Sequence, residues 1–218
     1  DEVRDYAKAD EKFDFITHRN FKDIPFEHLR PDKDNNWINL TDNDWDSLLP
    51  VADKSVKNHS APYGAIFNLY SNGIVTARDE WLYSFSHDNV SNKSSHFIDI
   101  FNSECKRWHE SSHTMKINDF VNREIKWTEE LENHIERNSE LYYIQSRIRV
   151  SMYRPFVEQF VYYDRIIVHR LYQQANIFPI EDNESFNRVI CFSGLSSSKP
   201  FSLIATNLLP SFDLIEKT

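Results

Sequence analysis

Two histidines four residues apart form the strongest metal-binding pattern in the sequence. They belong to His109-Glu110-Ser111-Ser112-His113, which fits the pattern H-E-x-x-H. On a helix, both imidazoles of this pattern share one face and can bind Zn²⁺, while the glutamate acts as general base on the metal-bound water. No G-x-x-H continuation supplies a third ligand, and serines are weak helix formers. The favoured interpretation is no metal site, with a zinc-dependent hydrolase using His109, Glu110 and His113 as the alternative.

A second chemical pattern is Glu124-Ile125-Lys126, which matches the E-x-K half of a restriction-type nuclease site. Such a site needs a preceding aspartate on a neighbouring strand, and Asp99 and Asp119 are the candidates. Tripeptides of this kind are common, so a solvated strand face is favoured. With only 3 Gly the chain cannot form a G-x-G-x-x-G or G-x-x-x-x-G-K-[ST] phosphate loop, and it has no Gly-x-Ser-x-Gly elbow. We therefore predict no catalytic site and no cofactor in this chain.

The composition is that of a globular protein with an aromatic core. Hydrophobic residues make up 40% of the 218 residues and aromatic residues 14%, which provides ample apolar surface to bury. Two cysteines, Cys105 and Cys191, are too few and too far apart for a disulfide scaffold or a cysteine-based zinc site. No apolar run approaches the roughly 20 residues of a membrane span. The charged start, without methionine, lacks a signal peptide. These features predict a cytoplasmic fragment of a longer chain, with reduced thiols and no membrane contact.

The charge is unevenly distributed along the chain. The net charge of −9 argues against a generic nucleic-acid binder, because phosphate contacts need lysine and arginine. Residues 1–50 hold 13 acidic and 7 basic residues, a balance of −6. Residues 143–179 hold five arginines against two acidic residues, a balance of +3. A local basic face on an acidic body is therefore expected near residues 143–179.

Hydrophobic periodicity predicts one α+β domain over residues 1–218. Phe97, Phe101, Cys105 and Trp108 recur at spacings of 4, 4 and 3, which indicates one face of an amphipathic helix with Ser94 or Ser95 as N-cap. Further helices are predicted over residues 7–18 and from a cap at Thr128 through Ile135, and a tight turn at Asn72-Gly73. Strands are predicted at residues 65–70, 74–76, 81–85, 121–127, 148–153, 160–163, 189–192 and 202–205. Without βαβ alternation, this order favours an antiparallel or mixed sheet with a few packed helices.

Several unusual short stretches occur together in a recognisable order. In chain order they are Ala65–Trp81, Ile125-Lys126-Trp127, Tyr153-Arg154-Pro155-Phe156, Tyr163-Asp164-Arg165, Ile177-Phe178-Pro179, Asn187–Ile190, Lys199-Pro200-Phe201 and Ala205-Thr206-Asn207. Their order and spacing resemble the C-terminal specificity domain of type ISP restriction–modification enzymes. The upstream stretches Leu29–Trp37 and Pro50–Lys54 fit the start of that domain. The resemblance covers nearly the whole chain.

The resemblance implies a function without catalysis in this chain. In the family, nuclease, helicase-type ATPase and N6-adenine methyltransferase modules precede this domain, which reads an asymmetric sequence in double-stranded DNA and presents the target adenine to the methyltransferase. S-adenosylmethionine, ATP and Mg²⁺ would belong to those other modules. The acidic segment Thr128–Asn133 would repel phosphate, which argues against DNA contact there. A protein-interaction module with an aromatic core is the second alternative.

The candidate DNA-binding residues fall into two groups. Motifs shared by relatives that read different sequences cannot read bases, so they hold the fold, face the methyltransferase or bind phosphates. Base reading is expected in individual loops, at residues 89–96 and 107–116, where polar side chains reach base edges. The candidates for phosphate contact are Arg78, Arg154, Arg165, Arg170 and Lys199, and those for base reading include Lys93 and Arg107. For Arg78, an internal pair with Asp79 is an equally good prediction.

Overall fold

The computed structural model describes residues 8–24, 26, 28–31, 48–53, 64–67, 69–182, 186–194 and 200–215. The chain divides into two compact units, residues 1–49 and residues 50–218, and each is described by itself. The first unit contains α1 (Ala9–His18), which confirms the helix predicted there, and a 3-10 turn, η1 (Phe21–Asp23). That residues 1–49 belong to the same domain as the rest stays a prediction.

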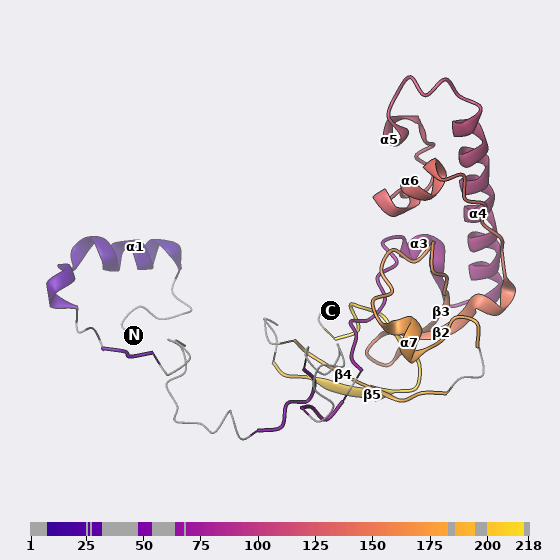
Figure 1. The fold of residues 1–218 in the computed structure, drawn as a ribbon. Coiled ribbons are helices and arrows are strands. Elements are labelled where there is room, and N and C mark those ends of the chain that lie inside the picture. The colour runs from indigo at the N-terminus through magenta and orange to yellow at the C-terminus, as the bar shows by residue number, and fades with distance from the viewer. Residues whose placement is uncertain are drawn as a thin grey trace. The chain divides into compact units, whose positions relative to one another are not determined.

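The second unit is built on a four-stranded mixed sheet with the order β1-β3-β2-β6. The long hairpin of β2 (Ile148–Arg154) and β3 (Val157–Tyr162) is antiparallel and confirms two predicted strands. β1 (Tyr83–Ser84) pairs antiparallel with β3, and β6 (Leu209–Pro210) runs parallel to β2. Helices cover this sheet, so the fold class is α+β as expected (Figure 1).

The sheet is covered by α4 (His87–His109), which also packs against α6 (Glu129–Glu136). The predicted apolar face of α4 is buried, but the helix begins earlier than expected. Ser86 is the N-cap, and its hydroxyl accepts a hydrogen bond from the backbone of Asn89, so Ser94 lies inside the helix. The predicted cap at Thr128 is the N-cap position of α6. The other described helical elements of this unit are the short helices α3 (Asp79–Leu82), α5 (Ile117–Phe120) and α7 (Gln174–Ile177) and the 3-10 turn η3 (Gln145–Arg147).

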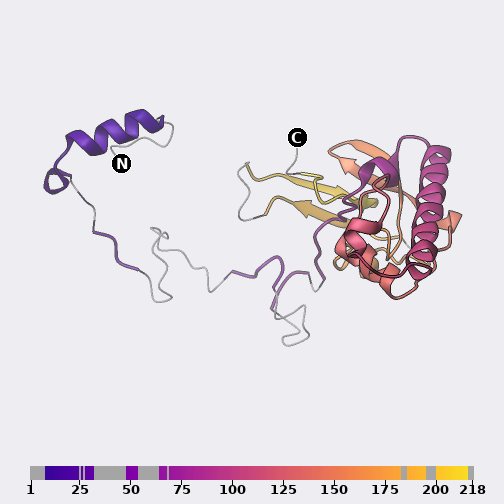
Figure 2. The ribbon, with the colours of Figure 1, turned by 90° about the horizontal axis from the view of Figure 1, so that it is seen from above.

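A separate two-stranded ribbon extends away from α4 (Figure 2). It consists of β4 (Val189–Phe192) and β5 (Leu203–Thr206), both at predicted strand positions. The antiparallel register pairs Ile190 with Ala205 and Phe192 with Leu203. Because cross-strand partners share a face and side chains alternate, these four lie on one face of the ribbon, and all four are exposed. The other face packs toward the domain through Val189.

Both cysteines are free thiols, in agreement with the sequence prediction. Cys105 lies in the core on α4, and Cys191 lies on the packed face of β4. Burial raises the pKa of the Cys191 thiol to about 11, so this thiol is protonated and unreactive at neutral pH.

Three predicted strands are wrong or displaced. The stretch from residue 65 to 70 shows a single bridge, between Phe67 and Ala52, among its described residues. Trp81 belongs to α3, so only Tyr83 and Ser84 of the predicted 81–85 strand are extended in a ladder. Residues 121–127 form no strand.

Gly73 is required by a close backbone approach rather than by the predicted tight turn. The bridge between Ile74 and Ser211 brings two backbone segments together at this point. A Cβ on Gly73 would lie 2.4 Å from the Ser211 carbonyl carbon, which is closer than Cβ atoms approach backbone atoms in proteins. The glycine therefore allows residues 74–75 to bridge β6 and the segment around Arg170.

Candidate nucleic-acid interface

The structure does not support a zinc site at the H-E-x-x-H pattern. α4 ends at His109, so the four residues that follow are not on a helix, and His113 has a left-handed φ of 52°. Nε2 of His109 lies 2.8 Å from the Ile135 carbonyl oxygen. Because that oxygen can only accept, Nε2 carries the hydrogen and donates. The described residues contain no group of three His, Cys, Asp or Glu side chains that could hold a metal ion.

The E-x-K pattern is likewise engaged in structural contacts. Glu124 lies 3.1 Å from Nε2 of His96 on α4, and its backbone N–H donates to the Asn122 side chain. Ile125 is buried in the core, and the segment is not a strand. These contacts favour the solvated-surface interpretation over a nuclease half-site.

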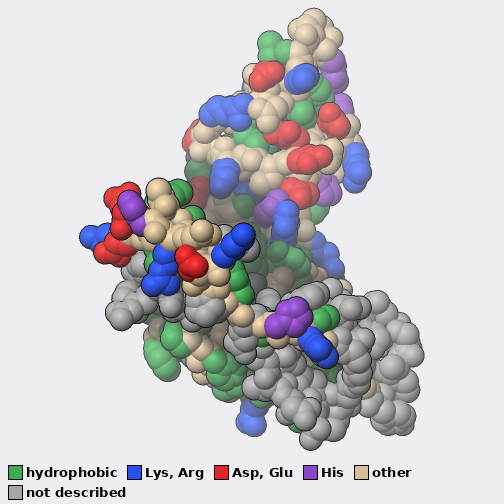
Figure 3. Space-filling model, turned by 90° about the vertical axis from the view of Figure 1, so that its left-hand side faces the viewer, with side chains coloured by type: hydrophobic (Ala, Val, Ile, Leu, Met, Phe, Trp, Pro, Cys, Tyr) green, Lys and Arg blue, Asp and Glu red, His purple; other side chains and the backbone are tan. Residues whose placement is uncertain are grey.

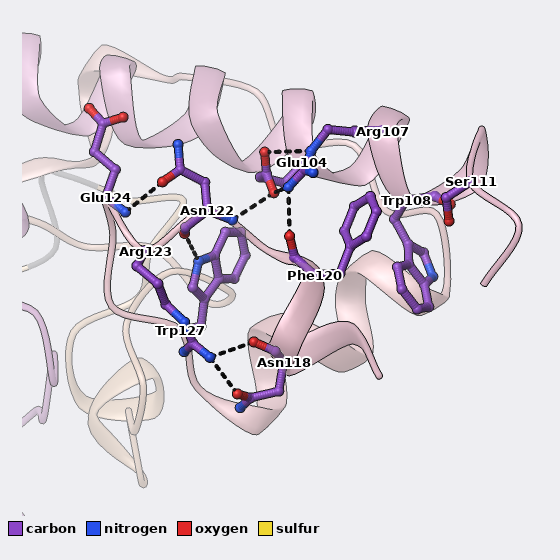
Figure 4. Close-up of polar contacts among 10 residues, drawn as sticks. All are labelled: Glu104, Arg107, Trp108, Ser111, Asn118, Phe120, Asn122, Arg123, Glu124 and Trp127. Carbon is purple, nitrogen blue, oxygen red and sulfur yellow. Dashed lines mark hydrogen bonds and ion pairs between the residues drawn. The ribbon is translucent and has the colours of Figure 1, made fainter. Parts of the chain in front are cut away.

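Arg107, a predicted base reader, belongs to a hydrogen-bonded network that holds residues 117–127 against α4 (Figure 4). It donates to both carboxylate oxygens of Glu104 and, over 2.8 Å, to the Phe120 carbonyl, and it stacks on the Phe120 ring at 4.0 Å. The same Glu104 carboxylate accepts the backbone N–H of Asn122 at 2.8 Å. The Asn122 carbonyl in turn accepts the indole N–H of Trp127 at 2.6 Å. Arg107 therefore fixes the fold here, and the prediction that it reads a base is not supported by its position.

Arg78 lies in the interior, with 0% of its surface exposed. Its Nη1 donates to the Ile167 carbonyl and its Nη2 to the Thr128 hydroxyl at 3.1 Å, while the guanidinium lies 5.5 Å from the centre of the Phe97 ring. Burial lowers its pKa to about 10, so it remains charged at neutral pH. A fully buried guanidinium cannot reach a phosphate in this conformation, so the position of Arg78 does not support the predicted DNA contact. The predicted pair with Asp79 does not form, because Asp79 accepts hydrogen bonds from Thr76 and Tyr153, and Arg78 instead has the internal partners Ile167 and Thr128.

Three of the five arginines between residues 143 and 179 have hydrogen-bond or ion-pair partners within the domain. Arg147 pairs with the buried carboxylate of Asp164. Arg149 donates to three backbone carbonyls in the segment 179–182. Arg165 is more than half exposed and lies 3.7 Å from Glu181, just outside the segment whose charge was counted. The local balance of +3 therefore overstates the positive charge available to a partner.

Arg154 and Arg170 are the remaining two, and they have no acidic partner within 4 Å among the residues that the structure describes. Arg154 ends β2, stacks on the Tyr153 ring at 4.3 Å and donates one hydrogen bond to the Tyr153 carbonyl. Arg170 is exposed and exchanges two backbone hydrogen bonds with Val75. Lys93 is half-buried on α4 rather than in a loop. Lys199 lies outside the described residues.

Two exposed aromatic residues were missed by the sequence analysis. Phe156, in the turn between β2 and β3, is 89% exposed and has a left-handed φ of 61°. Tyr172 is also exposed, with a φ of 50°, and stacks on the Phe212 ring. Bulky residues rarely adopt this backbone conformation. The only sequence signal was the Pro155 that precedes Phe156, since proline is common in tight turns.

Charges of both signs are interspersed over the α5–α6 end of the second unit on the face shown in Figure 3. α4 exposes Asp88 and Asp99 along its length and Lys106 and Arg107 at its end, where Lys106 lies 3.9 Å from Glu110. This helix face is therefore poorly suited to bind phosphates, which are attracted by lysine and arginine.

The family assignment follows from comparison with known proteins. The sequence model of the type ISP C-terminal specificity domain matches residues 65–218. The chain belongs to this family. No curated protein matches it. No helix in the described part of the chain is long and apolar enough to cross a membrane.

Three solved structures, two of them of type ISP enzymes, resemble this specificity domain. A cryo-electron microscopy structure of a DrdV–DNA complex is 36% identical, with a TM-score of 0.81 over 99% of this chain and 21% of the DrdV chain. A nuclease-deletion mutant of the type ISP enzyme LlaGI, in complex with a DNA substrate mimic, is 28% identical, with a TM-score of 0.79 over 97% of this chain and 17% of that one. The ATP-dependent type ISP enzyme LlaBIII, bound to DNA, is 29% identical, with a TM-score of 0.67 over 86% and 11%. The specificity domain thus spans about a fifth or less of these chains.

Within this type ISP specificity domain, the short stretches on which the resemblance was based take two different roles. Arg78 and Asp79 lie among core contacts between α3, α4 and the sheet. The stretch Tyr153–Phe156 instead forms the end of the β2–β3 hairpin, with Arg154 half-buried and Phe156 exposed. Of these two stretches, Tyr153–Phe156 is the one available to a partner.

Proposed function

We propose that this specificity domain binds duplex DNA at a short asymmetric sequence and holds the target adenine for a methyltransferase elsewhere in the parent protein. The observation that carries the proposal is the family match together with three similar structures whose proteins are bound to DNA or a DNA substrate mimic. The domain has no catalytic role of its own in this proposal. S-adenosylmethionine, ATP and Mg²⁺ would be used by other parts of the parent protein, in the cytoplasm where DNA is available.

Base reading fits the exposed loop between α4 and α5 best. Arg107 is bonded internally, and the residues of the predicted sets that lie in a loop, as expected for base readers, are 110–116. His113, Thr114 and Lys116 are exposed there and carry hydrogen-bonding groups. Such side chains can reach base edges in the major groove.

The first prediction concerns affinity and separates base readers from phosphate contacts. We expect the chain to bind duplex DNA in the micromolar range or more weakly at physiological salt, because its net charge is −9. A preferred sequence should emerge from selection on random duplexes at low salt. Lys116→Ala should then cost about 1–3 kcal/mol on that sequence alone, while Arg170→Ala, at an exposed arginine without an acidic partner among the described residues, should weaken binding to all duplexes alike. Fluorescence anisotropy measures both, and a chain that binds no duplex at any salt concentration would refute the proposal.

The apolar outer face of the β4–β5 ribbon fits a protein partner rather than DNA. Ile190, Phe192, Leu203 and Ala205 form this face, and none of them carries a charge or hydrogen-bonding side chain for phosphates. The similar proteins are about five times longer than this chain or more. We assign the ribbon face to contact with the methyltransferase part of the parent protein.

This second prediction is tested in the full-length parent protein. Phe192→Asp should place a charge in the contact, reduce methylation of the target adenine and increase proteolysis between the two domains. Phe13→Asp on α1, another exposed phenylalanine, serves as the control. Unchanged methylation and proteolysis in the Phe192→Asp protein would show that the ribbon faces something else.

A further inference from the structure

Two short elements, one at the end of β2 and the other joined to Val75 by an isolated bridge, repeat the same unusual arrangement. Arg154-Pro155-Phe156 and Arg170-Leu171-Tyr172 each place an exposed aromatic residue two positions after an arginine. Both aromatic residues have a left-handed φ, 61° at Phe156 and 50° at Tyr172. Neither arginine has an acidic partner within 4 Å among the described residues.

The left-handed φ of Phe156 is imposed by the two-residue turn Pro155-Phe156, which the pairing of Arg154 with Val157 closes. A left-handed φ is unfavourable for a bulky side chain and persists only where surrounding structure imposes it. The Phe156 ring is 89% exposed, so burial of the ring does not stabilise this turn. Strained, exposed residues of this kind occur at binding sites, where the fold presents a side chain to a partner.

The hairpin that carries Phe156 is held rigidly at its base. The Tyr153 hydroxyl donates to Asp79 over 2.9 Å, and the Tyr153 ring packs 4.7 Å from that of Tyr83. The Arg154 guanidinium lies over the Tyr153 ring and donates one N–H to the backbone carbonyl of Tyr153. An arginine has five N–H donors, so most of those of Arg154 remain for a ligand.

Backbone pairing places the second element beside the first. The Ser211 N–H donates to Met152 on β2, and the next residue, Phe212, donates to Ile74. Val75 then exchanges hydrogen bonds with Arg170. With strands spaced about 4.8 Å apart, these three steps separate the two elements by roughly 14 Å. Tyr172 also stacks on Phe212, with ring centres 6.4 Å apart, which extends the aromatic surface toward β2.

We propose that these two arginine-aromatic elements form one sequence-independent contact with duplex DNA. Arg154 and Arg170 bind backbone phosphates, and Phe156 inserts as an apolar wedge between two base pairs beside them. The proposal rests on the DNA-binding function proposed above and names the surface that carries it. Arginine contacts phosphates whatever the sequence, and an exposed apolar ring can insert between base pairs of a duplex without hydrogen-bonding to base edges.

The surrounding charges favour DNA over a protein at this surface. They also limit the affinity of the surface for DNA. The β4–β5 face, which we assign to a protein, has no cation, whereas each aromatic residue here has its own arginine. Asp79 is committed to Tyr153 and Thr76. Glu130 lies near Arg170 but pairs with His169 at 3.1 Å, and Asp213 lies near Tyr153. The contact therefore depends on two arginines and on stacking.

The test uses the 218-residue chain and random-sequence duplexes over a series of salt concentrations. Arg154→Ala and Arg170→Ala should each flatten the slope of log affinity against log salt by about one unit. Phe156→Ala should weaken binding about five- to hundredfold with the slope unchanged, since stacking is not electrostatic. Phe156→Trp should retain affinity, and its added fluorescence should be quenched by DNA. Phe201→Ala and Arg137→Ala, exposed residues of the same types elsewhere, should leave both quantities unchanged.

The outcomes distinguish this inference from the proposed function. If the unaltered chain binds no duplex, the proposed function fails and this inference fails with it. If the chain binds DNA but all three alanine variants keep their affinity and salt slope, only the surface assignment is wrong. If Phe156→Ala binds DNA normally and instead loosens the domain from the rest of the full-length protein, the surface contacts protein and the inference is overturned.

Discussion

Replacing Arg78 with alanine is expected to lower the free energy of unfolding by about 3–5 kcal/mol. The substitution removes the donors to Ile167 and Thr128 and leaves a cavity beside Phe97, all within the core. Arg78→Lys should recover little of this, because a single ammonium group cannot reproduce the two-nitrogen arrangement of a guanidinium. Urea unfolding followed by tryptophan fluorescence measures the loss.

The control for Arg78 is an exposed arginine in the same unit. Arg137→Ala at the end of α6 should change the free energy of unfolding by less than about 0.5 kcal/mol. If Arg78→Ala unfolds like the unaltered chain while DNA affinity and salt slope fall, Arg78 contacts phosphate as the sequence analysis predicted. Loss of stability with unchanged binding by the folded protein supports the buried role.

The sequence predicted most regular elements because their signals are local. The buried face of α4 follows from Phe97, Phe101 and Trp108 at helical spacing, and β2 to β5 follow from short apolar runs. The start of α4 was missed because residues 87–89 are polar, and only the Ser86 hydroxyl bond to Asn89 shows where the helix begins. The predicted strand at 65–70 had the right composition, but tertiary context decides strand pairing.

The candidate site was predictable only in part, because the partners of an arginine are set by the tertiary fold. Arg78 meets Ile167, 89 positions away, and Thr128, 50 positions away. Arg165 meets Glu181, so a charge balance taken over one stretch of sequence counted it as available. The sequence did not predict a binding role for Phe156, because its exposure and its left-handed φ are properties of the folded hairpin.

Replacing Glu104 with alanine is expected to cost about 2–4 kcal/mol of unfolding free energy. Its carboxylate is buried on α4 and accepts hydrogen bonds from Arg107 and from the Asn122 backbone. Without it, the Asn122 N–H loses its acceptor, and Arg107 keeps only its bond to the Phe120 carbonyl. Residues 117–127 should then detach from α4 more readily, so the Asn122 amide should exchange hydrogen faster than amides in β2 and β3.

A double-mutant cycle shows whether Glu104 and Arg107 act as one unit. Since both hold the same segment through a shared hydrogen-bonded contact, Glu104→Ala and Arg107→Ala together should cost less than the sum of the two, with a coupling energy of about 1.5–3 kcal/mol. A base-reading Arg107 would behave differently. Its loss would leave unfolding unchanged, lower affinity for the preferred duplex alone and show no coupling to Glu104. The cycle and the binding titration therefore assign Arg107 either to the fold or to DNA, and the contacts in Figure 4 favour the fold.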